Sequence, residues 1–210
     1  MKAMVQARSA DTRDKILAAA TDLIVEKGHV AVSMKDLVDQ SGVSNGSIFH
    51  HFGSKDGVLE AIFVRERRAY LSHIGREMVS FEGDPCDAFG HGGRVAIEYQ
   101  ARDPWRHFRL ITQFSHSDWL NENTPVWRNL AEELQGPIVE WAAPHFAAGA
   151  LPILPPPIFQ SMILGAAEHT CQQWRNQRIG GDLASYGPGV AAFIAAGLKY
   201  LRDNPAPMDF

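Results

Sequence analysis

A chain of 210 residues with 45% hydrophobic and 21% charged residues has the composition of a globular protein with a buried core, which excludes a disordered chain. Its formal net charge of −4 argues against a general nucleic-acid binder, although residues 1–55 carry seven basic against six acidic residues. Two cysteines, Cys86 and Cys171, are too few for a disulfide framework, and no apolar run reaches the roughly 18 residues of a membrane span. We therefore expect a cytoplasmic protein.

The chain opens with two helices. The first is expected to begin at Asp11 or Thr12, to follow an amphipathic stripe with the spacing of one helix face, and to end at Gly28. The second begins at Ser33, and Asp36 three residues later supplies the carboxylate of a capping box.

Two further helices follow after short turns. Gly42 ends the second helix, Ser44 caps the third, and Gly53 breaks it. Ser54 then caps a fourth helix through "KDGVLEAIFVRERRAYLSHIGREM". Nothing in the first 80 residues is typical of a strand.

The remaining residues also predict helices. A break at Asp103-Pro104 separates the first two, Pro125 stands at the first position of the next, and Gly136-Pro137 favours a kink there. The expected helices span residues 86–102, 104–120, 124–146, 157–177 and 185–204, with "LPILPPP" as an extended connector. The fold class is therefore all-α with about nine helices, divided into a domain of residues 1–54 and a domain of residues 55–210.

The second and third helices form a helix-turn-helix pattern, in which a tight turn joins two short helices. A helix that enters a major groove needs small polar residues at its start and an apolar inner face that holds it on its own domain. Residues 44–47, "SNGS", meet the first need, and Val43, Ile48 and Phe52 meet the second. The pattern therefore favours DNA binding by the domain of residues 1–54.

The same residues resemble the TetR family of bacterial transcriptional regulators. Its motif runs from a valine through small polar residues to an aromatic cluster and a lysine. It is matched here by Val43, Ser44, Asn45, Gly46, Ser47, Ile48, Phe49, His50, His51, Phe52 and Lys55. One position departs from the family, because Phe49 stands where a tyrosine is usual and cannot offer a hydroxyl to a phosphate.

The resemblance implies two sets of DNA contacts. Residues expected to face the groove are Ser44, Asn45, Gly46, Phe49 and His50. Residues expected to meet phosphates are Ser33, Ser47, His51 and Lys55. A metal site at the paired histidines is disfavoured, because adjacent residues on a helix point about 100° apart.

A homodimer is expected, because operator symmetry pairs two recognition helices. The last two helices carry small and apolar faces that suit an interface, although an internal core is an equally ordinary use of such faces. The candidate interface residues are Ile163, Gly165, Ala166, Ala167, Phe193, Ala196, Gly197 and Tyr200.

The middle of the chain is rich in aromatic residues. Singly, each is more typical of core, but as a set they exceed what a thin helical bundle needs. By the resemblance they would line a pocket for an apolar or aromatic effector, formed by Trp105, Phe108, Arg109, Ile111, Phe114, Trp119, Trp127, Met162, His169 and Trp174. No cofactor or metal is expected.

The leading interpretation is a dimeric, ligand-responsive repressor that binds a palindromic operator and is not an enzyme. The alternative is an enzyme or small-molecule carrier whose N-terminal helices are a packing module. Polar residues that would serve such chemistry are present, but no two have a recognised catalytic or metal-binding spacing: His107, His116, His145, Asp118 and Glu122.

Overall fold

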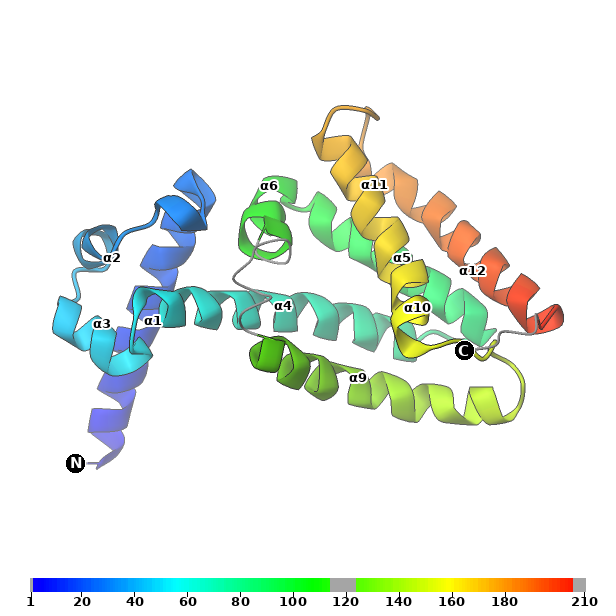
Figure 1. Ribbon diagram of the computed structural model, residues 1–210, viewed down its shortest axis with the longest axis horizontal. Coiled ribbons are helices and arrows are strands. Elements are labelled where there is room, and N and C mark those ends of the chain that lie inside the picture. Colours follow the sequence, from blue (N-terminus) through cyan, green and yellow to red (C-terminus); the bar gives the residue numbers. More distant parts are fainter. Residues whose placement is uncertain (1, 114–123, 206–210) are drawn as a thin grey trace. The chain divides into compact units, whose positions relative to one another are not determined.

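The computed structural model describes residues 2–113 and 124–205, apart from the side chains of residues 2–8, 124–127, 156 and 157 (Figure 1). The described residues form helices and turns and contain no strand. The predicted all-α fold is confirmed.

The chain divides into two compact units. The first comprises Met1–Arg67 with Trp105–Thr124, and the second comprises Arg68–Pro104 with Pro125–Phe210. The predicted boundary between residues 54 and 55 divides a region expected to bind DNA from a region expected to bind an effector and to dimerise. It stays a prediction.

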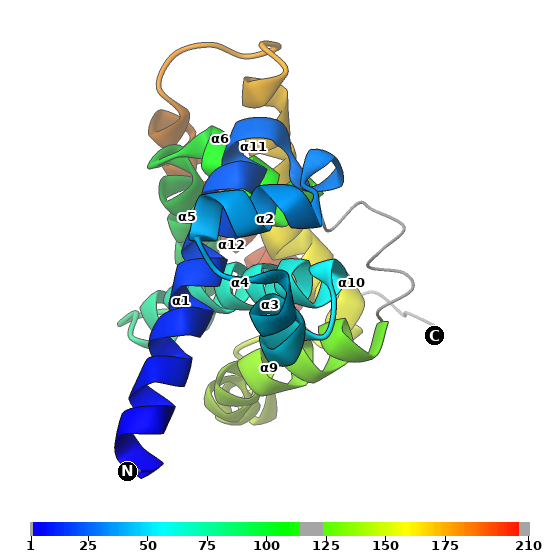
Figure 2. The same cartoon turned by 90° about the vertical axis from the view of Figure 1, so that its left-hand side faces the viewer.

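The first unit is built around a long N-terminal helix, with two short helices lying beside it (Figure 2). Its buried faces meet in a core that includes Ile16, Ile24, Leu37, Ile48 and Ile62, each 0% exposed. The elements are α1 (Lys2–Lys27), the 3₁₀ turn η1 (His29–Ala31), α2 (Met34–Ser41), α3 (Asn45–Phe52), the start of α4 (Lys55–Val79), most of α6 (Pro104–His107) and the π-helical η2 (Phe108–Thr112).

Helix α1 begins at Lys2, so the start predicted at Asp11 is wrong. Residues 2–10 contain three alanines and neither glycine nor proline, and such a segment propagates a helix at little cost. A residue that can cap a helix therefore does not set its start when the residues before it also favour helix. The predicted end is confirmed, since Gly28 follows Lys27 with φ 80°.

The turn between α2 and α3 follows its sequence signals closely. Gly42 caps α2 at φ 66° and ψ 13°, a left-handed conformation that glycine adopts without Cβ strain. Its N–H donates to the carbonyl of Val38 at 3.0 Å. Ser44 is the N-cap of α3, as predicted, and its hydroxyl oxygen accepts from the N–H of Ser47.

The second unit is a helical bundle. Helix α9 continues through Pro137 and Pro144 without interruption. The predicted helix at 157–177 consists of an α segment, a π-helical segment and a second α segment in direct succession. The elements are the end of α4, α5 (Pro85–Ala101), α9 (Thr124–Ala147), α10 (Pro156–Gln160), η3 (Ser161–Gly165), α11 (Ala166–Arg175), the 3₁₀ turn η4 (Leu183–Tyr186) and α12 (Gly187–Asp203).

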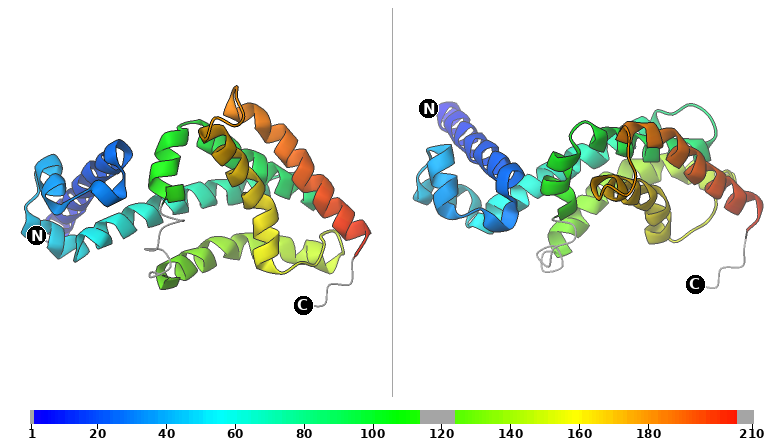
Figure 3. Two further views of the ribbon diagram at one scale, coloured as in Figure 1. Left: turned by 45° about the horizontal axis from the view of Figure 1, so that its top comes forward. Right: turned by 90° about the horizontal axis from the view of Figure 1, so that it is seen from above.

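Helices α5 and α12 pack side by side along their length (Figure 3). Their approach depends on Gly90, where a Cβ atom would lie 2.5 Å from the carbonyl oxygen of Ala191. Phe89 is also on α5, and its ring lies 4.6 Å from that of Phe159 and 5.7 Å from that of Trp141. Because burying one such ring stabilises a fold by about 1.5–3 kcal/mol, Phe89 is a main contact between α5, α9 and α10.

Candidate functional site

Helix α3 has one buried face and one exposed face. Ile48 is fully buried and Phe52 is half-buried, so this side holds the helix on the first unit. The opposite side exposes Asn45, Gly46 and His50, together with Phe49, whose residue surface is 47% exposed. A large aromatic side chain left this open on a polar helix face is available to a partner.

The hydroxyls of two residues expected to meet DNA already serve as helix caps. Ser33 Oγ donates to Asp36 Oδ2 at 2.6 Å and accepts from the N–H of Asp36 at 3.2 Å. Ser44 Oγ accepts from Ser47 N at 3.3 Å. The Ser33 hydroxyl therefore has no proton left for a phosphate unless it leaves Asp36, whereas Ser44 keeps its own proton.

The start of α4 adds a cation next to the recognition helix. Lys55 is the first residue of α4, and the preceding Ser54 caps the helix by accepting from Gly57 N at 3.0 Å. Burial lowers the pKa of His29, and the charge of Lys55 acts in the same direction, against a hydrogen bond with the Gln113 side chain that raises it. His29 is therefore neutral at pH 7 and leaves the positive charge here to Lys55.

The paired histidines are stacked edge to face, with the ring centroids of His50 and His51 5.4 Å apart at 71°. His51 also lies against Phe52, at 6.3 Å between centroids. Across the described parts of the chain, no group of three or more His, Cys, Asp or Glu side chains is placed to hold a metal ion.

Residues 105–113 belong to the first unit, where η2 packs on helix α1. Arg106 donates to both carboxylate oxygens of Glu66, at 3.0 and 3.4 Å, and Arg65 binds Glu66 at 2.9 Å and the Thr21 hydroxyl at 2.9 Å. Burial would raise the pKa of Glu66, but Arg106 and Arg65 hold it below its usual range. Glu66 is thus a charged link between α4 and α6.

The structure places the expected effector residues in both units. In the first, Trp105 is 55% exposed, Phe108 meets it edge-on at 6.2 Å between ring centroids, Ile111 is buried and Arg109 is half-buried. In the second lie Met162, His169 and Trp174. Phe114 and Trp119 lie outside the described residues, as does the side chain of Trp127.

The expected effector residues of the second unit already make contacts within the chain. Trp174 Nε1 donates to the carbonyl of Gly181 at 2.8 Å. His169 Nε2 lies 2.9 Å from Gln173 Nε2 on the exposed side of α11, so the pair shares one hydrogen bond. Met162 is half-buried and packs against the core.

The second unit contains a buried polar network that was not predicted from the sequence. Gln100 is fully buried, and its amide donates to the Tyr70 hydroxyl at 3.2 Å and accepts from Arg175 at 3.3 Å. Tyr70 in turn donates to Glu168 at 3.3 Å. The sequence does contain a signal for this burial. Gln100 lies three residues after Ile97 and four after Ala96, which places it on the apolar face of α5. The network joins α4, α5 and α11.

The expected interface residues also divide into two groups. Ile163 and Ala167 are buried in the core of their own chain, whereas Phe193 and Tyr200 of α12 are 72% and 66% exposed. Ala196 and Gly165 are exposed, and Ala166 and Gly197 are half-buried. The exposed apolar face is thus carried mainly by α12.

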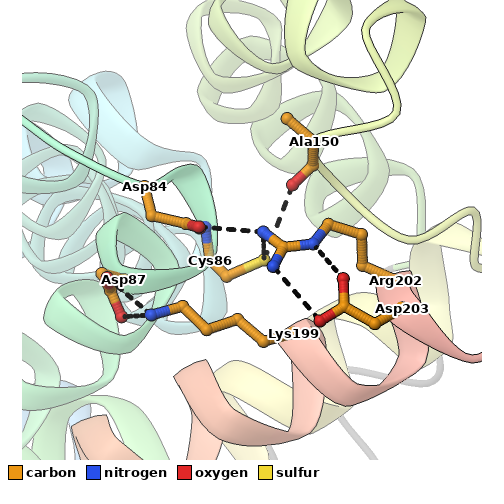
Figure 4. Close-up of polar contacts among 7 residues, drawn as sticks. All are labelled: Asp84, Cys86, Asp87, Ala150, Lys199, Arg202 and Asp203. Atoms are coloured by element: carbon orange, nitrogen blue, oxygen red, sulfur yellow. Dashed lines mark hydrogen bonds and ion pairs between the residues drawn. The ribbon is translucent and has the colours of Figure 1, made fainter.

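Charged side chains fix the end of α12 to the start of α5 (Figure 4). Lys199 Nζ lies 2.6 and 2.8 Å from the two oxygens of Asp87, and Arg202 donates to Asp84 at 2.8 Å. Burial opposes ionisation of Asp84, but the hydrogen bond from Arg202 holds its pKa below the usual range. The buried thiol of Cys86 donates to the carbonyl of Ala150 beside these pairs.

Comparison with known proteins identifies the N-terminal region. Residues 16–62 match the family model of bacterial regulatory proteins, tetR family. The match identifies this region as a TetR-type DNA-binding domain. The HTH-type transcriptional repressor Rv3405c of Mycobacterium tuberculosis is 40% identical over 63 residues, which are 30% of this chain and 29% of the relative. The chain therefore matches less than a third of that relative's length.

Solved structures resemble the chain over most of its length. A TetR family transcription regulator from Marinobacter aquaeolei VT8 has a TM-score of 0.72 at 14% identity, covering 92% of this chain and 98% of its own. The regulator FadR from Bacillus subtilis, solved with stearoyl-CoA, has a TM-score of 0.64 at 18% identity, covering 88% and 98%. These likenesses show that both units have the TetR-family fold. No helix among the described residues is long and apolar enough to cross a membrane.

Proposed function

We propose that this protein is a dimeric, ligand-responsive transcriptional repressor of the TetR family that acts in the cytoplasm. The observation that carries the proposal is the exposed face of α3, with Asn45, Gly46, Phe49 and His50 presented outward and Ile48 fully buried behind them. A short helix with small polar residues at its exposed start fits a major groove.

Base reading and phosphate binding fall to different residues. Asn45, an amide at the exposed start of α3, is suited to reading a base edge, and Lys55 at the start of α4 is suited to a phosphate. Lys55→Ala should weaken binding to all sequences alike, and Asn45→Ala should change base preference. Footprinting and selection from a random duplex library test this, and the absence of a protected palindrome would refute the proposal.

The dimer would bring two copies of α3 about 34–36 Å apart, one turn of DNA. The exposed apolar face of α12, with Phe193, Ala196 and Tyr200, supports this interface because such faces are costly to leave in water. Light scattering of the full chain measures the oligomeric state, and a monomer at micromolar concentration would contradict the dimer.

An apolar or aromatic effector would release the operator by a population shift. The ligand must bind the state that does not fit DNA more tightly than the DNA-competent state, since equal affinity shifts nothing. Support comes from the exposed Trp105, which contacts the half-buried Phe108, and from FadR, which was solved with stearoyl-CoA. A screen of apolar ligands for release of bound operator tests the response, and no release across the library would refute it.

A further inference from the structure

The helix-turn-helix carries too little positive charge to hold DNA by itself. Residues 33–54 contain one lysine, Lys35, against two acidic residues, Asp36 and Asp39, which gives a net charge of −1. The affinity of a protein for DNA comes largely from cations that neutralise phosphates. The cations that hold the recognition helix on DNA must therefore come from helices beside it.

Helix α1 places one cation directly at the recognition helix. The guanidinium carbon of Arg13 lies 4.7 Å from the centroid of the Phe52 ring. Phe52 is the last residue of α3. A guanidinium stacked on an aromatic face is held in place while its N–H edge stays open to other partners.

Arg13 differs from other cations of α1 in its surroundings. The residue is exposed, and among the side chains that the structure describes none forms an ion pair with it. Other cations of α1 differ, since Lys15 lies 2.8 Å from Asp11 and Lys27 lies 2.8 Å from Asp36. Arg13 is thus an oriented, open cation at the C-terminal end of α3.

We propose that Arg13 binds a phosphate of the DNA backbone beside the C-terminal end of α3. The inference rests on the proposed DNA-binding function and adds a residue outside the helix-turn-helix to it. The guanidinium fork offers two N–H donors to phosphate oxygens, and stacking on Phe52 fixes the fork before DNA arrives. Its contribution is independent of base sequence, because a phosphate carries no base identity.

The test compares two substitutions that remove the same charge from the same helix. Arg13→Gln should weaken binding of the full chain to its selected duplex and to unrelated duplexes by about tenfold, and should reduce the slope of log affinity against log salt by about one. Lys15→Gln, the matched control, removes a cation that already has a partner and should change affinity by less than about twofold.

Arg13→Lys tests the planar guanidinium group separately from the positive charge. It keeps the cation without the planar donors, so its affinity should lie between those of the wild type and Arg13→Gln. Thermal unfolding of each variant shows whether the fold is intact. If Arg13→Gln unfolds, the comparison of Arg13→Lys with Lys15→Gln decides, and equal affinities overturn the proposal.

The outcomes also distinguish a failure of the Arg13 proposal from a failure of the proposed DNA-binding function. If the wild type selects no duplex, the proposed function fails and not the role of Arg13 alone. If the wild type and Lys15→Gln bind tightly and Arg13→Gln binds equally well with the same salt slope, DNA binding stands and the role of Arg13 is overturned.

Discussion

Lys27 Nζ lies 2.8 Å from Asp36 Oδ2, which joins the last turn of α1 to the first turn of α2. The same carboxylate oxygen accepts from the backbone N–H of Ser33 at 2.7 Å and from its hydroxyl at 2.6 Å. These hydrogen bonds, led by that from Lys27, hold the pKa of Asp36 well below its usual range. The entry to the helix-turn-helix is thus fixed by one ionised carboxylate.

We therefore expect Asp36 to stabilise the fold only where it is ionised. Because its pKa is lower in the folded chain than in the unfolded chain, its contribution is fully present above about pH 4 and is lost as the pH falls below that value. The urea midpoint of Asp36→Asn should lie below that of the wild type at pH 7, and the two should approach each other toward pH 3. A gap that is constant across this range would contradict the prediction.

The buried thiols should be unreactive in the folded protein. Cys86 and Cys171 are both 0% exposed, and burial raises their pKa values to about 11 and about 12. At pH 8 at most about one Cys86 thiol in a thousand would be a thiolate, which is the reactive form. A chromogenic disulfide should label both residues quickly in guanidinium chloride and neither quickly in buffer. Rapid native labelling of one equivalent would contradict this burial.

The helix-turn-helix could be predicted from the sequence because the signals that specify it are local. The capping box of Ser33 and Asp36, the cap at Ser44 and the left-handed Gly42 each act within four residues, so the pattern alone determines them. The start of α1 was missed because several residues before Asp11 also favour helix, and a cap-forming residue does not by itself stop one.

The second unit was harder to predict because helix spacing does not tell which neighbour a face meets. Ile163 and Ala167 have the spacing of an interface, yet they pack in their own core, whereas Phe193 at a similar spacing is open. Gln100 was overlooked because a single glutamine does not disturb an apolar periodicity. Its role depends on Tyr70 and on the distant Arg175, which only the fold brings together.

The exposed face of α12 gives a direct test of the dimer. Phe193 is 72% exposed in the single chain. Phe193→Glu would place a charge at a position that is buried in the proposed dimer. The fold should survive, but light scattering should show a monomer, and operator affinity should fall with it. Val139→Glu is the matched control, since Val139 is an exposed apolar residue of α9, 61% open, and its variant should remain dimeric. A dimer that persists in Phe193→Glu would place the interface elsewhere.

Gly46 allows stability and DNA binding to be separated. It lies in the first turn of α3, it is exposed, and an added Cβ atom would meet nothing within 4 Å in the free chain. Leucine favours helix over glycine, so Gly46→Leu should leave the free energy of unfolding unchanged or raise it by up to about 1 kcal/mol. On DNA, the larger side chain would occupy space that a groove-bound helix needs, so operator binding should be lost. Urea unfolding and fluorescence anisotropy measure the two quantities on one sample. A variant that is stable and still binds the operator with unchanged preference would show that this face of α3 does not enter the groove.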